Sequence, residues 1–181
     1  MNVHPRGIPE VVVLEPRAFE DARGFFYESF NRKVLEAALG RPLEFVQDNH
    51  SLSVKSVLRG LHYQLPHPQA KLVRAIRGEV FDVAVDLRKD SPTFGRWVGE
   101  VLSARNRRQL FIPEGFAHGF FVLSEEAEVL YKTTDYWRPE AERCILWNDP
   151  ELAIEWPFGR ETPVVSPKDS AGQSFRQAPH Y

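Results

Sequence analysis

The sequence predicts an all-β protein, a β-barrel or sandwich with one short helix and an irregular C-terminal tail. Short runs of β-branched and aromatic residues recur along the chain and are separated by Gly, Pro and Asn turns, a pattern typical of β-sandwiches and barrels. With 181 residues, of which 43% are hydrophobic, the chain has the size of one domain, 1–181, that buries a core without disulfides.

The N-terminal third contains two short strands and the one convincing helix. Residues 11–14 form a β-branched run, and residues 24–30 are aromatic and extended in character. The helix begins after Asn31, which can cap it, and ends at Gly40. Its apolar stripe contains Val34, Leu35, Ala38 and Leu39.

Strand patterns dominate from residue 57 onward. Residues 79–87 alternate most clearly, with one face formed by Phe81, Val83, Val85 and Leu87 and the other by Asp82, Ala84 and Asp86. From about Asn148 the chain is Pro-rich and irregular, and we expect it to wrap back over the barrel. The predicted strands are 57–65, 71–77, 79–87, 96–102, 109–112, 119–123 and 129–136.

Composition excludes several classes of protein. A net charge of −2 without a run of Lys or Arg argues against a nucleic-acid-binding surface. No apolar stretch approaches the roughly 20 residues of a membrane span, and the N-terminus lacks a signal-peptide pattern. Cys144 is the only cysteine, which excludes an intrachain disulfide and fits a reducing compartment. We therefore expect a cytoplasmic protein without a membrane or nucleic-acid partner.

Residues 113–118 have the Pro-x-Gly-x-x-His form of the second motif of cupin jelly rolls. In that motif a tight turn, with Gly supplying unusual backbone angles, leads into a strand that carries an inward His. The alternative is an ordinary turn followed by a buried His118. The motif favours a cupin-type jelly roll.

The metal ligands of a cupin are missing from the expected positions. A metal-binding cupin would show His-x-His at residue 62 and a Glu on the next strand. This chain has Gln64 two residues after His62, and its next strand opens with Lys71. The sequence therefore predicts the scaffold of a metal cupin without its ligand set, and leaves open that His62 is structural.

A hairpin through residues 66–69 would bring His62 and Lys71 together. In that register His62 pairs with Val73 and lies diagonal to Lys71 on one face, where the two side chains would act as base and electrophile. Alternation places Arg59 on the opposite face unless Gly60 marks a bulge. Tyr131 lies in the middle of its strand, and the sequence pattern alone favours a core or rim role for it.

Motifs along nearly the whole chain resemble those of the dTDP-4-dehydrorhamnose 3,5-epimerases of nucleotide-sugar biosynthesis. Many motifs in the order and spacing of one family make the resemblance specific. They are Asp21-x-Arg23-Gly24-x-Phe26, residues 45–51, residues 58–64, Gln69-x-Lys71-Leu72-Val73, Ile112-Pro113-x-Gly115-x-x-His118-Gly119, Tyr131-Lys132, residues 147–150 and Ser166-x-Lys168-Asp169.

The resemblance implies a jelly-roll homodimer that acts on a dTDP-4-keto-6-deoxyhexose without a metal or cofactor. His62 matches the base, Asp169 the carboxylate paired with it, Lys71 the enolate-stabilising residue and Tyr131 the acid across the ring. Arg23 and Arg59 match diphosphate contacts, and Phe26 a residue that stacks on thymine. Further binding positions, some expected to serve the partner subunit's site, are Glu28, Gln47, Asn49, His118, Glu142 and Lys168.

Four alternatives remain at this point. A metal-dependent cupin is disfavoured by Lys71 and by the absent His-x-His. A non-catalytic sugar-binding cupin has no need of an acid and a base on opposite faces. A mono-epimerase acting at C3 or C5 alone would use the same four residues, and a 3,4-ketoisomerase matches fewer motifs.

Overall fold

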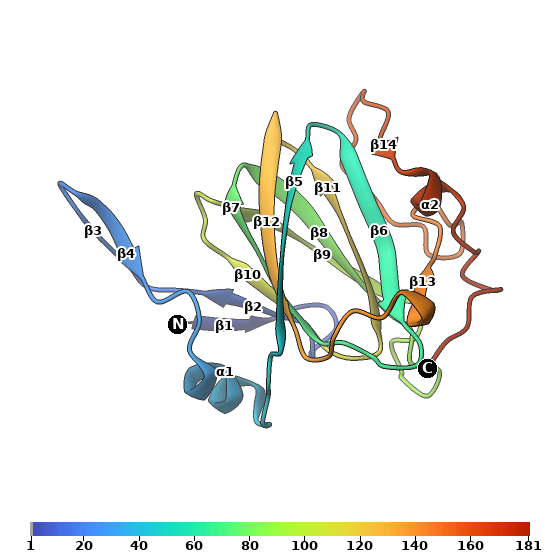
Figure 1. Cartoon of the computed structure of the whole chain (residues 1–181), viewed down its shortest axis with the longest axis horizontal. Helices are drawn as coiled ribbons and strands as arrows, with labels where there is room; N and C mark the ends of the chain where they lie inside the picture. The colour runs from blue at the N-terminus through green and yellow to red at the C-terminus, as the bar shows by residue number, and fades with distance from the viewer. Residues whose placement is uncertain (1) are drawn as a thin grey trace.

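The computed structural model describes residues 2–181 and consists of two sheets, with a small hairpin projecting from the body (Figure 1). The first sheet contains, in spatial order, β1 (Asn2–Pro5), β2 (Val12–Glu15), β10 (Gln109–Ile112), β7 (Lys71–Arg77), β12 (Glu126–Thr133) and β5 (Gln47–Val54). The second contains β13 (Glu142–Cys144), β6 (Val57–Gln64), β11 (Phe116–Val122), β8 (Glu79–Asp86) and β9 (Trp97–Ser103), and β14 (Val164–Val165) pairs in parallel with β6. The all-β prediction is confirmed.

The main core lies between the two sheets. Val73 and Leu110 of the first sheet pack in one buried cluster with Val80 and Phe120 of the second. Burial of large side chains between facing sheets is the usual source of stability in a sandwich. This core fixes the distance between the sheets and so the space in which a ligand can bind.

The outer face of the second sheet is covered by the C-terminal tail. Val83 and Val85 of β8 face outward and pack against Trp156 and Phe175 of the tail. The alternation predicted for this strand is present, yet its polar side is also buried, and Asp82 is fully inaccessible to solvent. The tail therefore wraps over the body as expected, and it includes the short helix α2 (Pro167–Ser170).

The outer face of the first sheet is covered by helix α1 (Arg32–Leu39). The Asn31 side chain caps the helix by accepting a hydrogen bond from Val34 N at 3.2 Å, and Gly40 ends it in the left-handed conformation. Both features match the prediction and the usual chemistry of helix ends. Leu35 is buried against Phe111 of the sheet.

The predicted hairpin between residues 57–65 and 71–77 is wrong. Strand β6 belongs to the second sheet and β7 to the first, so the segment between them crosses from one sheet to the other. His62 pairs with His118 of β11 and Cys144 of β13, whereas Val73 pairs with Leu110 and Tyr131. Residues 65–70 are long enough to span the roughly 10 Å between packed sheets, so a tight turn is not required there.

A bulge at Gly60 turns Arg59 and His62 toward the same cavity. The register between β6 and β11 shifts at this point, and Gly60 has a φ of 121°. A Cβ at this position would lie 2.5 Å from Gly119 Cα, so only glycine fits the close approach of the two backbones. The bulge that the sequence left open is therefore present.

Several elements were not predicted, and most predicted strand boundaries differ from the observed ones by one to three residues. Strand β11 begins earlier than expected, at Phe116, and β12 ends earlier, at Thr133. Across residues 2–181, no helix is long and apolar enough to cross a membrane. The additional elements are β1, β5, β13, β14, α2, the 3-10 helix η1 (Pro139–Ala141), and β3 (Ala18–Asp21), which forms the projecting hairpin with β4 (Gly24–Tyr27).

Candidate active site

A cavity of about 330 Å³ opens between the two sheets. Its walls come from strands of both sheets, from the segment after β12 and from the C-terminal tail, so segments distant in sequence meet there. It is lined by Asn49, Ser51, Arg59, His62, Tyr63, Gln64, Gln69, Lys71, His118, Gly119, Phe120, Tyr131, Trp137, Glu142 and Lys168.

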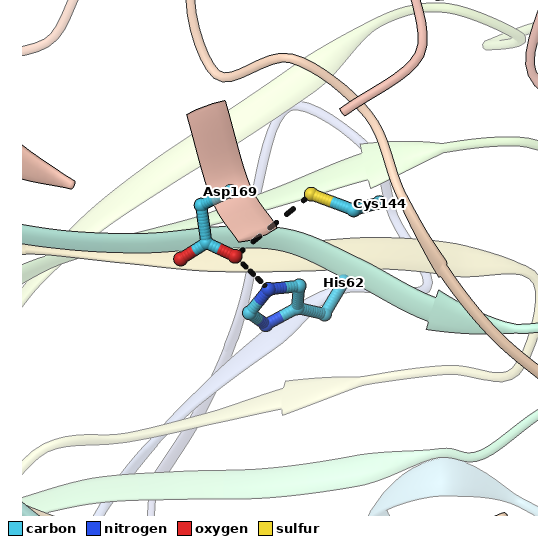
Figure 2. Close-up of side chains that lie close together, drawn as sticks. All are labelled: His62, Cys144 and Asp169. Carbon is cyan, nitrogen blue, oxygen red and sulfur yellow. Dashed lines mark hydrogen bonds and ion pairs between the residues drawn. The ribbon is translucent and has the colours of Figure 1, made fainter. Parts of the chain in front are cut away.

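His62 is held by Asp169. Its Nε2 lies 2.5 Å from Asp169 Oδ1 (Figure 2), and the carboxylate is 3% exposed. Asp169 is fixed in turn by α2, where its backbone N–H donates to the Ser166 side chain at 3.1 Å. Burial alone would raise the pKa of Asp169, but the contacts with His62 and the Gly60 N–H outweigh it and lower that pKa. The carboxylate is therefore ionised and orients the ring.

The hydrogen bond between His62 and Asp169 determines which ring nitrogen is available. Since Nε2 donates to the carboxylate, neutral His62 carries its proton on Nε2 and presents Nδ1 as an acceptor. Figure 2 shows the second ring nitrogen directed away from Asp169. The arrangement suits a general base whose imidazolium is stabilised after proton uptake.

Lys71 and Tyr131 face His62 from the opposite sheet. Tyr131 of β12 pairs with Val73 of β7, which makes Lys71 its diagonal neighbour on the same face. The Lys71 Nζ lies 5.8 Å from the centre of the Tyr131 ring. Burial lowers the pKa of Lys71 to about 8, and burial raises the pKa of Tyr131. Below pH 8 the site therefore presents an ammonium group beside a protonated phenol.

In the cavity wall, His118 forms a second buried pair with Asp82. The His118 Nε2 lies 2.9 Å from Asp82 Oδ2, and burial lowers the pKa of His118 despite this contact. Asp82 was not singled out as a site residue. Alternation along β8 grouped Asp82 with Ala84 and Asp86 on one face of the strand, but it gave no sign that this face would be buried beside His118.

The polar rim is organised by Glu142. Its carboxylate lies 2.5 Å from the Lys168 Nζ and accepts a hydrogen bond from the Trp137 indole at 3.3 Å. Burial would raise the pKa of Glu142, but Lys168 and Trp137 outweigh it and lower that pKa. Arg59 donates to the Ser53 hydroxyl at 2.9 Å. The rim thus carries cationic groups and fixed hydrogen-bonding groups suited to a polar ligand with negative charge.

Some predicted binding residues lie away from the cavity. Arg23 and Phe26 belong to the projecting hairpin of β3 and β4 (Figure 1). There Arg23 pairs with Asp21 at 2.6 Å, and Phe26 is 71% exposed. Glu28 is also exposed. Gln47 is not a wall of the cavity but donates to Asn49, which is, at 2.9 Å. The remaining predicted residues line the cavity or, like Asp169, contact a residue that does.

Other cavity residues were not predicted individually. Gln64 appeared only as evidence against a metal site, yet its side chain donates to the His67 carbonyl and accepts from the Arg138 N–H. Trp137 follows a strand whose end was placed too late. Ser51 lies on β5, which was not predicted because its sequence contains few β-branched or aromatic residues.

Known proteins match this chain over nearly its whole length. A family model described as dTDP-4-dehydrorhamnose 3,5-epimerase matches residues 5–177. The dTDP-4-dehydrorhamnose 3,5-epimerase of Pseudomonas aeruginosa is 64% identical over 171 residues, which cover 94% of each chain. The dTDP-4-dehydrorhamnose 3-epimerase of Streptomyces niveus is 43% identical, and the match covers 93% of this chain and 81% of that protein.

A solved structure extends the similarity to the fold. The dTDP-6-deoxy-D-glucose-3,5-epimerase of Legionella pneumophila Philadelphia 1, in complex with dTDP-4-keto-L-rhamnose, superposes with a TM-score of 0.94. It is 54% identical, and the match covers 97% of this chain and 93% of that one. The similarity therefore spans the whole fold, including both sheets and the tail.

Proposed function

This chain belongs to the dTDP-4-dehydrorhamnose 3,5-epimerase family, and we propose that its cavity converts dTDP-4-dehydro-6-deoxy-D-glucose to dTDP-4-dehydro-L-rhamnose. The enzyme is an isomerase of dTDP-rhamnose biosynthesis. Inversion at C3 and C5 is possible because the 4-keto group acidifies the hydrogens on both flanking carbons. The reaction needs a base, a group that stabilises negative charge on the carbonyl oxygen, and an acid on the opposite face.

The observation that carries the proposal is the placement of a base and an acid on opposite sheets. His62 extends from β6 of the second sheet, and Tyr131 from β12 of the first, into one cavity. A sugar ring bound between the sheets would present one face to each residue. Such a geometry serves deprotonation on one face and reprotonation on the other, which is what inversion of a carbon centre requires.

His62 is the proposed base. Its Nδ1 takes the proton from C3 or C5, and the carbon–hydrogen electron pair moves into the enolate. Asp169 then stabilises the imidazolium across the short Nε2 contact. After reprotonation of carbon, His62 returns its proton to solvent and can act at the second centre.

Lys71 is the proposed oxyanion stabiliser. Its ammonium group is buried in the cavity wall, and the part of the chain that the structure describes places no carboxylate within ion-pairing distance of it. An unpaired buried cation is costly in the free enzyme and is compensated when negative charge develops on O4. His118, fixed by Asp82 beside it, would add a polar contact.

Tyr131 is the proposed acid. Burial raises the pKa of its phenol, so the proton needed for transfer to carbon is present at neutral pH. Deprotonated tyrosinate would be stabilised by the neighbouring Lys71 ammonium and reprotonated from solvent. The pair from β7 and β12 thus supports both charge stabilisation and proton delivery.

The nucleotide would lie toward the rim of the cavity. Arg59 and Lys168 supply positive charge for the diphosphate, and a planar guanidinium suits paired phosphate oxygens. Asn49, held by Gln47, would donate hydrogen bonds to the sugar or base. Glu142 would position Lys168 through their contact.

A homodimer would complete the site. The hairpin of β3 and β4 projects from the body (Figure 1), and its Phe25 and Phe26 are 60% and 71% exposed. Arg23 lies at its tip. We propose that this hairpin reaches a partner subunit, where Arg23 would contact the diphosphate, Phe26 would stack on thymine and Glu28 would hydrogen-bond to base or sugar. The single cysteine fits a reducing compartment, and we propose that the enzyme is cytoplasmic.

A deuterium-exchange experiment tests the proposal against the mono-epimerase alternative. dTDP-4-dehydro-6-deoxy-D-glucose is incubated with the enzyme in D₂O with EDTA, followed by proton NMR and coupled to a reductase. Deuterium at both C3 and C5, with an L-rhamnose-configured product, is the expected result. Exchange at one carbon would identify a mono-epimerase, and absence of exchange would overturn the assignment.

A further inference from the structure

We propose that His62, Cys144 and Asp169 form a binding site for Zn²⁺, and that occupancy of this site inhibits the enzyme. One potential ligand atom from each residue lies within 4.8 Å of the other two (Figure 2). The three are an imidazole nitrogen, a thiol sulfur and a carboxylate oxygen. Inhibition rests on the proposed role of His62 as base, whereas binding of the ion does not.

The ligand set matches the chemistry of zinc. Zn²⁺ takes nitrogen, sulfur and carboxylate oxygen ligands, and sites with three protein ligands keep a fourth position for water. With bonds of about 2.0–2.3 Å to these atoms, tetrahedral geometry places N and O about 3.3 Å apart and S and O about 3.6 Å apart. The present separations are 2.5 Å for His62 Nε2 to Asp169 Oδ1 and 3.9 Å for Cys144 Sγ to that oxygen. These two separations therefore lie within about 1 Å of the tetrahedral values, and the His62 and Cys144 ligand atoms lie within 4.8 Å of one another.

The three ligands lie on elements that already hold them in place. Cys144 of β13 pairs directly with His62 of β6, so the two side chains are cross-strand neighbours. Asp169 is fixed by its hydrogen bonds to Ser166 and from Gly60. Side chains ordered before binding lose little conformational freedom when the ion arrives.

A second cavity gives the ion a route to His62 and Asp169, the two proposed ligands that line it. It has a volume of about 430 Å³ and is lined by His62, Ser166, Lys168 and Asp169, among others. Two cations line this route: Arg59, which donates to the Ser53 hydroxyl at 2.9 Å, and Lys168, whose charge is balanced by Glu142 at 2.5 Å. The path approaches the pair from the side of the tail, and it meets the main cavity at Arg59, His62 and Lys168, which line both.

Bound zinc would block catalysis by changing the tautomer of His62. The free ring carries its proton on Nε2, which faces Asp169. Coordination through Nε2 displaces that proton, and the neutral imidazole then holds its proton on Nδ1. Because Nδ1 is the nitrogen that must accept the substrate proton, the base is lost. The thiol proton of Cys144 is released to water as the thiolate binds.

Cobalt provides a direct probe of the site. Cys144 is the only cysteine of the chain, so a thiolate-to-cobalt charge-transfer absorption on titration with Co²⁺ can come from no other residue. We expect this absorption in the wild-type enzyme, its displacement by Zn²⁺, and its loss in Cys144→Ala and Cys144→Ser. His50→Gln, which removes an exposed histidine paired with Glu128, is the matched control and should retain it. Absence of the absorption in folded wild-type enzyme would overturn the site.

Turnover then separates binding from inhibition. We expect Zn²⁺ to inhibit wild-type enzyme and His50→Gln, with recovery on addition of EDTA. Cys144→Ala and Cys144→Ser should keep their basal turnover. The Zn²⁺ concentration that inhibits them by half should be higher than for wild type by at least about tenfold, since loss of a metal-site residue commonly weakens metal affinity by that factor. Equal sensitivity in both cysteine variants would overturn the proposal. Thiolate–cobalt absorption without loss of turnover would overturn the inhibitory part and argue against His62 as base.

Discussion

His62 Nε2 lies 2.5 Å from Asp169 Oδ1, although 107 positions separate the two residues in the sequence. The contact joins a strand of the second sheet to a four-residue helix of the C-terminal tail. It fixes the tautomer of the ring and directs Nδ1 away from the carboxylate. The tail is therefore part of the proposed catalytic machinery as well as a cover for the sheet.

The first prediction concerns the charge of that carboxylate. In Asp169→Asn the amide can still accept the Nε2 hydrogen bond, but it cannot stabilise an imidazolium ion. We expect kcat to fall by about 10²–10⁴-fold, while circular dichroism and the melting temperature remain close to those of wild type. Steady-state kinetics measures the effect, with the exposed Asp48→Asn as control. A kcat close to the wild-type value would show that Asp169 only supports the fold.

The second prediction separates proton removal from proton delivery. Tyr131→Phe removes the proposed acid but leaves His62 and Lys71 in place. We expect substrate incubated in D₂O to exchange hydrogen at C3 or C5 while inversion falls by about 10²-fold or more, because His62 can return deuterium to the same face. Proton NMR reports exchange and configuration together. Inversion that keeps pace with exchange would rule out Tyr131 as the acid.

The third prediction is a pH dependence from Lys71. Burial lowers the pKa of this lysine to about 8, so its ammonium form predominates below that pH. We expect kcat/KM to fall as pH rises through about 8 and the positive charge is lost. In Lys71→Arg, whose guanidinium stays charged, this decrease should disappear even if the rate is lower overall. A pH profile unchanged by Lys71→Arg would assign the decrease to another group.

The same shift has a consequence for stability. Lys71 has a lower pKa in the folded protein than the 10.5 of the free side chain, so between about pH 8 and 10.5 the unfolded chain binds more protons. The contribution of Lys71 therefore makes the free energy of unfolding rise with pH in that window. Lys71→Met should lack this rise and, at pH 7, be more stable than wild type by about 1–3 kcal/mol. Urea unfolding measures both quantities.

The fourth prediction tests whether Arg23 acts in the partner's site. We expect His62→Ala and Arg23→Ala enzymes each to be weakly active, and activity to recover when the two are mixed and subunits exchange. One site of each mixed dimer then combines an intact His62 with an intact Arg23 from the other chain. Recovery should approach about a quarter of wild-type activity, because half the dimers are mixed and half their sites are intact. If Arg23 serves its own subunit, mixing restores nothing.

Local sequence signals predicted local structure well. Asn31 and Gly40 bounded the helix, and β7 was predicted without error in its limits. Alternation along β8 separated its two faces, although it could not show that the tail would bury the outer one. Strand β5 was missed because residues 47–54 are largely polar. This segment forms a strand because it pairs along its whole length with β12, and not because its own residues favour strands.

The site depends on contacts that no local pattern contains. The hairpin between β6 and β7 was a reasonable local interpretation, but β6 pairs instead with β11, β13 and β14. His62 and Lys71 do share a cavity, for a different reason from the one predicted: they face each other across the two sheets. Asp169 was assigned only through family resemblance, since nothing in the spacing of the tail relates it to residue 62.

The most direct test of the account is hydrogen exchange in His62→Asn. Substrate is incubated in D₂O with wild-type enzyme, His62→Asn or the control His50→Gln, and loss of the C3 and C5 proton signals is followed by NMR. We predict that wild type and His50→Gln exchange both positions, whereas His62→Asn slows exchange at both carbons by at least about 10²–10⁴-fold. Exchange in folded His62→Asn at the wild-type rate would contradict the assignment of His62 as the base.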